Sequence, residues 1–127
     1  MKRVTGIGGV FFKSQDPERL KEWYAKHLGL PVNQWGCSFE YDPQAEDAKK
    51  SSVQWSPFKA DTQYFEPSEK PFMINYTVDD LEALVEELKK EGVEVLGEIS
   101  VYEYGKFAHI MDCDGNKIEL WEPTGSF

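Results

Sequence analysis

Residues 6–30 read GIGGVFFKSQDPERLKEWYAKHLGL, and this stretch predicts a strand followed directly by a helix. Apolar side chains run through Gly6–Lys13, as is typical of a strand. Asp16 can cap the first amide groups of a helix, and the proline after it fits the first helical turn. Gly29 can adopt the left-handed conformation that ends a helix. We therefore expect a helix over Asp16–His27.

The same order returns later in the chain, where residues 72–92 read FMINYTVDDLEALVEELKKEG. Apolar side chains alternate along Phe72–Val78, which predicts a second strand. Asp80 can cap a second helix over Asp80–Glu91, and it follows Asp16 by 64 residues. Repetition at this spacing indicates that the chain contains the same structural unit twice.

Further strands separated by turns are expected after each predicted helix. In the first half these are Val32–Trp35, Cys37–Tyr41 and Ser52–Phe58, with a polar loop over Asp42–Ser51. In the second half they are Val93–Leu96 running on toward Tyr102, then Lys106–Asp112 and Asn116–Glu122.

The predicted fold class is α+β, with two β-α-β-β-β modules in one domain that spans residues 1–127. Module one covers 1–58, a linker covers 59–71, and module two covers 72–127. Each helix needs one face of its sheet to cover its apolar stripe. The remaining sheet faces are expected to meet across a shared concave cleft.

Composition excludes several classes of partner. The 127 residues carry a formal net charge of −9 and contain no cluster of Lys and Arg. Binding to nucleic acid or to an anionic membrane surface needs such a cluster. The chain also lacks a membrane-spanning apolar run and a signal-peptide pattern, so we expect a cytoplasmic protein whose partner is a small molecule.

Two stretches resemble a known family. Residues 9–30 and the ending Asp112–Pro123, DCDGNKIELWEP, are similar to the opening and the final strands of the vicinal oxygen chelate superfamily. That superfamily includes glyoxalase I, bleomycin-resistance proteins, fosfomycin-resistance enzymes and extradiol dioxygenases. The resemblance implies the two-module fold, a homodimer, and a divalent metal held by the first and last strand of each module.

The residues at those metal positions are poor ligands. Counting back from the helix caps gives Gly9 and Met73 on the two first strands, while the last strands offer Gln54 and Glu119. One carboxylate and one amide do not make a site for Zn, Ni, Fe or Mn. We therefore expect no cofactor and no metal. If a metal does bind, the replacement ligands would be Gln54, His109 and Glu119.

Strand alternation predicts which side chains face the cleft. The residues expected there as ligand contacts are Phe11, Gln54, Asn75, Phe107 and Trp121. His109 and Glu119 should lie opposite each other on neighbouring strands, where they form a candidate catalytic pair with histidine as general base. The alternative is an ordinary cross-strand ion pair on a half-exposed sheet face, which is common.

Two functions remain open at this point. The first is a glyoxalase/bleomycin-resistance-like protein that binds a small molecule in an aromatic cleft without the usual metal. The alternative is an atypical or metal-dependent lyase or dioxygenase of the same superfamily that uses Glu119, Gln54 and His109. A third possibility is that the protein is a paralogue within this superfamily that no longer binds a ligand.

Overall fold

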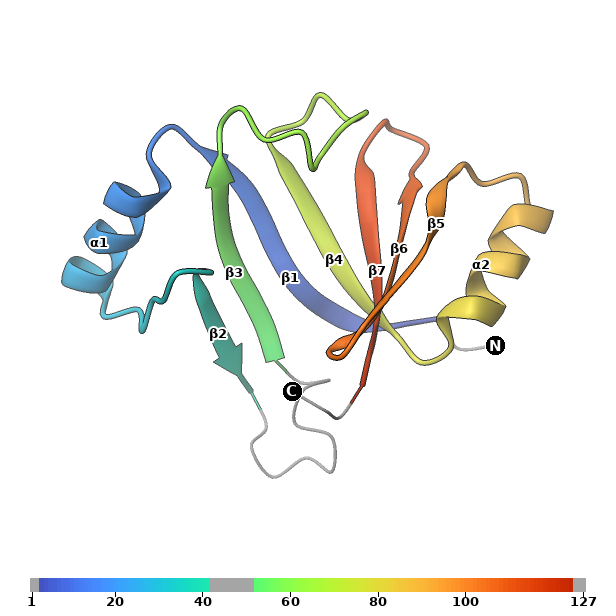
Figure 1. The fold of residues 1–127 in the computed structure, drawn as a ribbon, viewed down its shortest axis with the longest axis horizontal. Helices are drawn as coiled ribbons and strands as arrows, with labels where there is room; N and C mark the ends of the chain where they lie inside the picture. Colours follow the sequence, from blue (N-terminus) through green and yellow to red (C-terminus); the bar gives the residue numbers. More distant parts are fainter. Residues whose placement is uncertain (1–2, 42–51, 125–127) are drawn as a thin grey trace.

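The computed structural model describes residues 3–41 and 52–124. They form one mixed sheet of seven strands, with one helix packed against each half of the curved sheet (Figure 1). In chain order the elements are β1 (Val4–Ser14), α1 (Pro17–Leu28), β2 (Cys37–Glu40), β3 (Ser52–Lys59), β4 (Phe72–Val78), α2 (Leu81–Lys90), β5 (Val95–Tyr102), β6 (Gly105–Met111) and β7 (Lys117–Pro123). The α+β class predicted from the sequence is confirmed.

The strand order is β2-β3-β1-β4-β7-β6-β5, and the pairing follows the same pattern on both sides of the centre. The central strands β1 and β4 are antiparallel. Each has a parallel outer neighbour, β3 beside β1 and β7 beside β4. The next pairs outward, β2–β3 and β6–β7, are antiparallel. Segments from both halves of the chain therefore lie side by side in the middle of the sheet.

The first half departs from the predicted module, because Val32–Trp35 is not a strand. Its residues form a tight turn with a single bridge between Asn33 and Gly36. The Asn33 side chain accepts the amide of the second residue after it at 2.8 Å, and Gly36 has φ +122°. The buried Lys21 of α1 donates to two turn carbonyls, at 3.2 Å each. The described first half is thus β-α-β-β, and the predicted loop Asp42–Ser51 lies outside the described residues.

Both helices begin at the predicted caps. The Asp16 carboxylate accepts the Arg19 amide at 3.1 Å, and the Asp80 carboxylate accepts the Ala83 amide at 3.2 Å. These contacts satisfy amides that have no partner within the helix. At the other end of α1, Gly29 takes the left-handed conformation with φ +71°.

The main hydrophobic core lies between α2 and the second half of the sheet. Its buried members are Val78, Leu81, Leu84, Val85, Ala108, Ile110 and Leu120. The predicted apolar stripe of α1 is less well covered, because Trp23 is 52% exposed and Leu28 is 60% exposed. Tyr24 of α1 contacts the sheet, because its ring lies 4.9 Å from that of Trp55.

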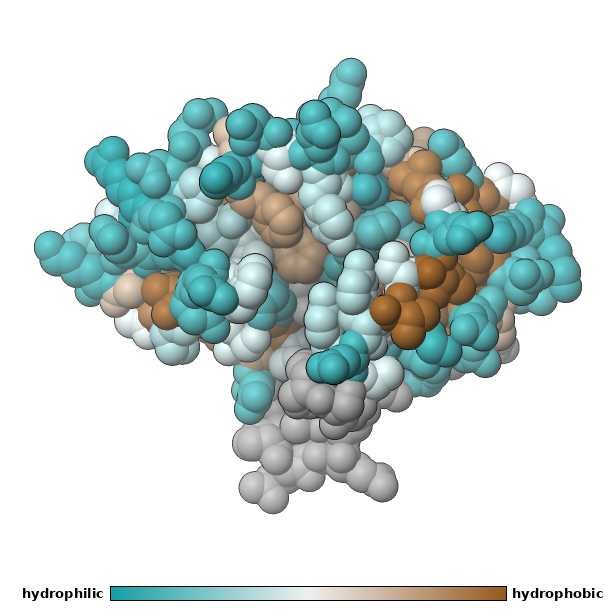
Figure 2. All heavy atoms as spheres, viewed as in Figure 1, coloured by the Kyte–Doolittle hydropathy of each residue, from teal (hydrophilic) through white to brown (hydrophobic). Residues whose placement is uncertain are grey.

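The face drawn in Figure 2 is mainly hydrophilic, with apolar side chains gathered over the central strands and near the β5–α2 end. No helix in the described part of the chain is long and apolar enough to cross a membrane. The apolar region over the central strands lies where the concave face of the sheet opens.

Candidate functional site

Glu119 of β7 is the centre of a buried hydrogen-bond network. Its register partners are Asn75 on β4 and His109 on β6. The Asn75 amide donates to Oε1 of Glu119 at 2.7 Å, and Nε2 of His109 lies 2.8 Å from Oε2. The glutamate is only 2% exposed, so these contacts replace the water that a carboxylate would otherwise bind.

Tyr64 completes this network, although it lies in the connection between β3 and β4. Its hydroxyl donates to Oε2 of Glu119. Burial and the charge of Glu119 raise the pKa of Tyr64, so the phenol keeps its proton and remains a donor. Lys117 fastens the loop by donating to the Tyr64 carbonyl at 2.6 Å.

Tyr64 was not among the site residues predicted from the sequence, because it belongs to neither repeated unit. One signal was available: Tyr64 and Phe65 are adjacent aromatic residues in an otherwise polar linker. Phe65 is fully buried, and its ring lies 5.2 Å from that of Phe58. This aromatic contact folds the linker back over one end of the concave face, which brings Tyr64 to Glu119.

A cavity of about 740 Å³, the central cleft, lies on the concave face beside Glu119. The residues that line it are Phe11, Gln34, Trp35, Ser38, Gln54, Ser56, Pro57, Phe58, Asn75, Tyr104, Phe107, Glu119 and Trp121. Both halves of the chain contribute. A volume of this size suits a small organic molecule.

Six of the residues that strand alternation predicted for the cleft do line it. Phe11, Gln54, Asn75, Phe107, Glu119 and Trp121 all line it. His109 is not among the lining residues, because the folded linker covers its end of the sheet. The Tyr64 ring stands edge-on to the His109 ring, with the two centroids 5.4 Å apart. His109 therefore meets the cleft through Glu119.

Aromatic rings form two walls of the central cleft. On one side Phe107 and Trp121 lie parallel, with centroids 5.9 Å apart and an interplanar angle of 4°. The Trp121 indole donates to the Tyr104 carbonyl at 3.0 Å, which fixes its plane. On the other side the rings of Phe11 and Phe58 are 5.5 Å apart. A flat ligand can contact both walls.

Gln54 is held by neighbours on the β2–β3 side of the cleft. Its Oε1 accepts the Ser38 hydroxyl at 2.5 Å, and its Nε2 donates to Ser56 Oγ at 3.1 Å. Ser56 in turn donates to the Trp35 carbonyl at 2.7 Å. The amide is therefore fixed in place as a polar contact.

Strand register identifies which residues occupy the family's metal positions. Gly9 pairs with Gln54 on one side and with Asn75 on the other, and Asn75 pairs with Glu119. Met73 lies opposite Phe11, so its assignment as the counterpart of Gly9 was wrong. Counting from the helix caps failed because the two halves differ in spacing: Gly9 lies seven residues before Asp16, whereas Asn75 lies five residues before Asp80.

The donor groups at these four positions are two amides and one carboxylate. Gly9 offers no side chain, and a Cβ there would lie 2.8 Å from the Phe11 ring. Within residues 3–41 and 52–124, no three His, Cys, Asp or Glu side chains cluster closely enough to hold a metal ion.

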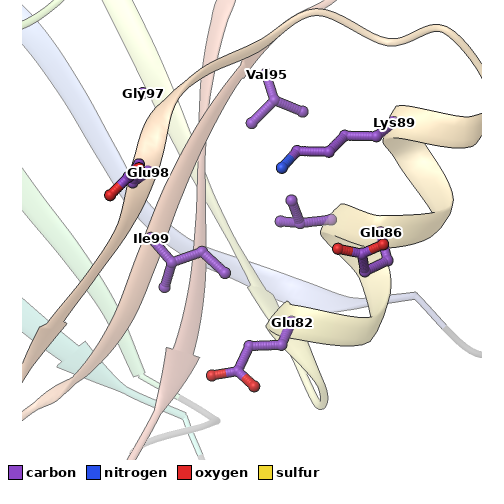
Figure 3. Close-up of a pocket in the computed structure, with 8 residues that line it drawn as sticks. Glu82, Glu86, Lys89, Val95, Gly97, Glu98 and Ile99 are labelled. Carbon is purple, nitrogen blue, oxygen red and sulfur yellow. The ribbon is translucent and has the colours of Figure 1, made fainter.

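A second cavity, of about 550 Å³, lies between α2 and β5. Figure 3 shows Val95 and Ile99 of β5 extending toward Glu82 and Lys89 of α2. Glu82 is already paired with Lys106 at 3.1 Å. Its lining combines apolar side chains with four charged ones, Glu82, Glu86, Lys89 and Glu98, and includes no residue of the Glu119 network.

The curved sheet, with the two halves of the chain meeting at a central cleft, defines a protein of the vicinal oxygen chelate class. Residues 6–120 match the profile of the Glyoxalase/Bleomycin resistance protein/Dioxygenase superfamily. The chain belongs to that superfamily. Among curated proteins, none matches the chain.

Solved structures share the fold at low sequence identity. Methylmalonyl-CoA epimerase from Mycobacterium tuberculosis has a TM-score of 0.63 and 22% identity, with 95% of this chain and 89% of that chain covered. A methylmalonyl-CoA epimerase in complex with methylmalonyl-CoA and NH4+ has a TM-score of 0.71 and 15% identity, with 97% of each chain covered.

A third similar structure is the Mn(II)-bound glyoxalase from Novosphingobium aromaticivorans. It has a TM-score of 0.63 and 21% identity. The alignment covers 96% of this chain and 40% of that chain. At these identities the three neighbours establish the fold, and the chain spans less than half of the glyoxalase.

Proposed function

We propose that this protein binds a small molecule with an aromatic part in the central cleft. The observation that carries the proposal is the cleft itself: parallel aromatic rings form a wall beside a fixed carboxylate and a fixed amide. Aromatic walls supply contact area, while a few placed polar groups orient the ligand. A protein of this fold, the methylmalonyl-CoA epimerase in complex with methylmalonyl-CoA, also binds a small molecule, which supports the proposal.

We further propose that binding does not use the superfamily's usual metal. Both Glu119 oxygens already accept hydrogen bonds, and the Gln54 amide is bonded to two serines. Gly9 contributes no donor atom. Zinc, nickel, iron and manganese sites need several imidazole, carboxylate or thiolate ligands, and this set contains one.

Catalysis is the second candidate, because the Glu119 carboxylate lines the cleft, where a general base would meet a ligand. A buried carboxylate held by three donors can accept a proton from a ligand that stands in the cleft. His109 would then be a positioning residue, since it contacts Glu119 and does not line the cleft. A lyase or dioxygenase that uses a metal on Gln54, His109 and Glu119 has less support, because His109 is directed at Glu119.

The homodimer and the cytoplasmic location also remain proposals. The exposed Trp23 and Leu28 on α1 offer apolar surface that a second copy can cover. Cys37 is buried and Cys113 is exposed, and both are free thiols, which fits a reducing compartment.

A combined metal analysis and binding screen tests the proposed function. Protein purified without chelator should contain far less than one divalent metal per chain, and a thermal-shift screen should find aromatic small molecules that raise the melting temperature. Trp121→Ala should weaken binding of each hit by roughly 1–3 kcal/mol, as for a well-packed aromatic contact.

Trp23→Ala is the matched control, because it removes the same side chain from an exposed helix face. Its affinity for each hit should equal that of the unaltered protein. Tight binding of one metal ion per chain, lost in Glu119→Ala, would contradict the metal-free proposal. Hits whose affinity is unchanged by Trp121→Ala would show that the ligand binds outside the central cleft.

A further inference from the structure

The central cleft has an unusual distribution of charge. Among the described residues that line it, Glu119 is the one charged side chain, and none is Lys, Arg or His. The rest of the lining consists of aromatic rings, a proline, amides and hydroxyls. A ligand in this cleft therefore meets a buried carboxylate, while the His109 ring that contacts this carboxylate lies outside the described cleft lining.

Two lysines on strands of the cleft, Lys117 of β7 and Lys13 of β1, lie outside its lining. Lys117 donates to the Tyr64 carbonyl at 2.6 Å, and its ammonium lies 5.2 Å from the Tyr64 ring. The Lys13 ammonium lies 5.9 Å from the ring of Phe65. Both contact the linker between β3 and β4, and neither lines the cleft.

Glu119 keeps capacity for one more donor. Its Oε2 accepts the Tyr64 hydroxyl and contacts His109, which uses both lone pairs. Its Oε1 receives only the Asn75 amide among the described contacts, so one acceptor direction on that oxygen is open. A carboxylate in apolar surroundings favours a neighbouring positive charge and strongly disfavours a negative one.

The aromatic walls favour the same kind of ligand. The faces of aromatic rings carry partial negative charge and attract cations within about 6 Å. Phe107 and Trp121 lie parallel on one wall, and Phe11 lies on the opposite one. The ring faces and the Glu119 carboxylate therefore both favour a positively charged ligand.

We infer that the central cleft selects an aromatic molecule carrying a positively charged, hydrogen-bond-donating nitrogen, and that it rejects carboxylates and phosphate esters. The aromatic part stacks on Trp121, and the charged nitrogen donates to Oε1 of Glu119. This inference rests on the proposed small-molecule function and adds the charge class of the ligand.

A matched series of naphthalene probes tests the inference. The probes are 2-naphthylmethylammonium, 2-naphthylmethanol and 2-naphthoate, which share one ring system and differ in charge. Isothermal titration should give the ammonium probe an affinity about tenfold or more above that of the alcohol, with the carboxylate weakest. Trp121→Ala should weaken all three probes, which places them in the cleft.

Glu119→Gln tests the source of the preference, because it keeps the size of the side chain and removes the charge. The ammonium probe should then bind no better than the alcohol. Glu22→Gln is the control: it makes the same change of net charge at an exposed position of α1 and should leave the preference intact.

The possible outcomes separate the two proposals. Binding of the carboxylate as tight as that of the ammonium would overturn the charge inference while leaving small-molecule binding in place. An ammonium preference that Glu22→Gln abolishes as fully as Glu119→Gln would also overturn it. Failure of all three probes to bind at millimolar concentration would overturn the proposed aromatic cleft together with the inference. The series on the unaltered protein gives this answer even where a variant does not fold.

Discussion

Glu119 shows how one buried side chain depends on groups from distant parts of the chain. Its partners come from β4, from β6 and from the connection between β3 and β4. Each donor offsets part of the cost of removing a carboxylate from water. The glutamate can stay in the cleft because three separate segments satisfy it.

Tyr64→Phe tests this dependence at the level of one atom. The substitution keeps the ring against Phe58 and removes the hydroxyl that donates to Glu119. Loss of a hydrogen bond to a charged group should lower the free energy of unfolding by about 1.5–3 kcal/mol. Urea denaturation at neutral pH measures this change in the free energy of unfolding.

Tyr102→Phe is the control for that experiment, because Tyr102 is exposed on the hairpin between β5 and β6. It should change the free energy of unfolding by less than about 0.5 kcal/mol. Equal effects of the two substitutions would show that the Tyr64 hydroxyl does not stabilise Glu119.

His109→Gln distinguishes binding from catalysis at the same network. If the protein only binds its ligand, the substitution should leave affinity within about threefold, because His109 does not line the cleft. If Glu119 acts as a base, turnover should fall while KM stays nearly constant, because the carboxylate loses the group that positions it. Steady-state kinetics with a screen hit that the protein converts to product measures turnover and KM.

At the scale of elements, the hairpin of β6 and β7 determines the shape of the aromatic wall. Gly105 opens β6 with φ +139°, a conformation that side chains rarely adopt. A Cβ at this position would lie 2.4 Å from Trp121 Nε1 and 2.5 Å from the Glu122 carbonyl oxygen. Only glycine lets the indole lie this close to the neighbouring strand.

Gly105→Ala should therefore both destabilise the protein and move Trp121. Backbone strain of this kind costs about 1–3 kcal/mol, and the contact with the indole adds to it. Chemical denaturation measures the loss, and a shift in tryptophan fluorescence reports the indole.

Gly97→Ala separates strain from contact, because Gly97 on β5 also has positive φ, +69°, with nothing within 4 Å of an added Cβ. It should cost about 1–2 kcal/mol and leave the fluorescence of the native protein unchanged. If both substitutions cost the same and neither moves the indole, the close approach at Gly105 does not shape the wall.

At the scale of the whole molecule, the open question is what covers the apolar side chains on α1. We predict that the 14.6 kDa chain sediments as a species of twice that mass at micromolar concentration. Trp23→Asp should shift the equilibrium toward monomer, because a charge in an apolar contact is costly to bury. Val101→Asp on β5, where the side chain is 67% exposed, is the control and should leave the mass unchanged. A single species near 14.6 kDa at all concentrations would contradict the dimer.

Local sequence determined most of the elements and which face of each strand meets the cleft. The caps Asp16 and Asp80 act on amides three residues away, and alternation along β4 or β7 depends only on strand geometry. That is why Asn75, Glu119 and Trp121 could be assigned to the cleft from the sequence. The predicted roles of these residues in ligand binding remain predictions.

Tertiary structure alone decided three other features: the register of β1 against β4, the turn that replaces a strand at Val32–Trp35, and the position of Tyr64 on Glu119. Each depends on residues far apart in the chain. A bulge, a buried lysine or an aromatic contact in a linker changes which residues meet without changing the periodicity of the sequence. The sequence by itself therefore determined the elements and their faces, while packing between them selected the groups that surround the buried carboxylate.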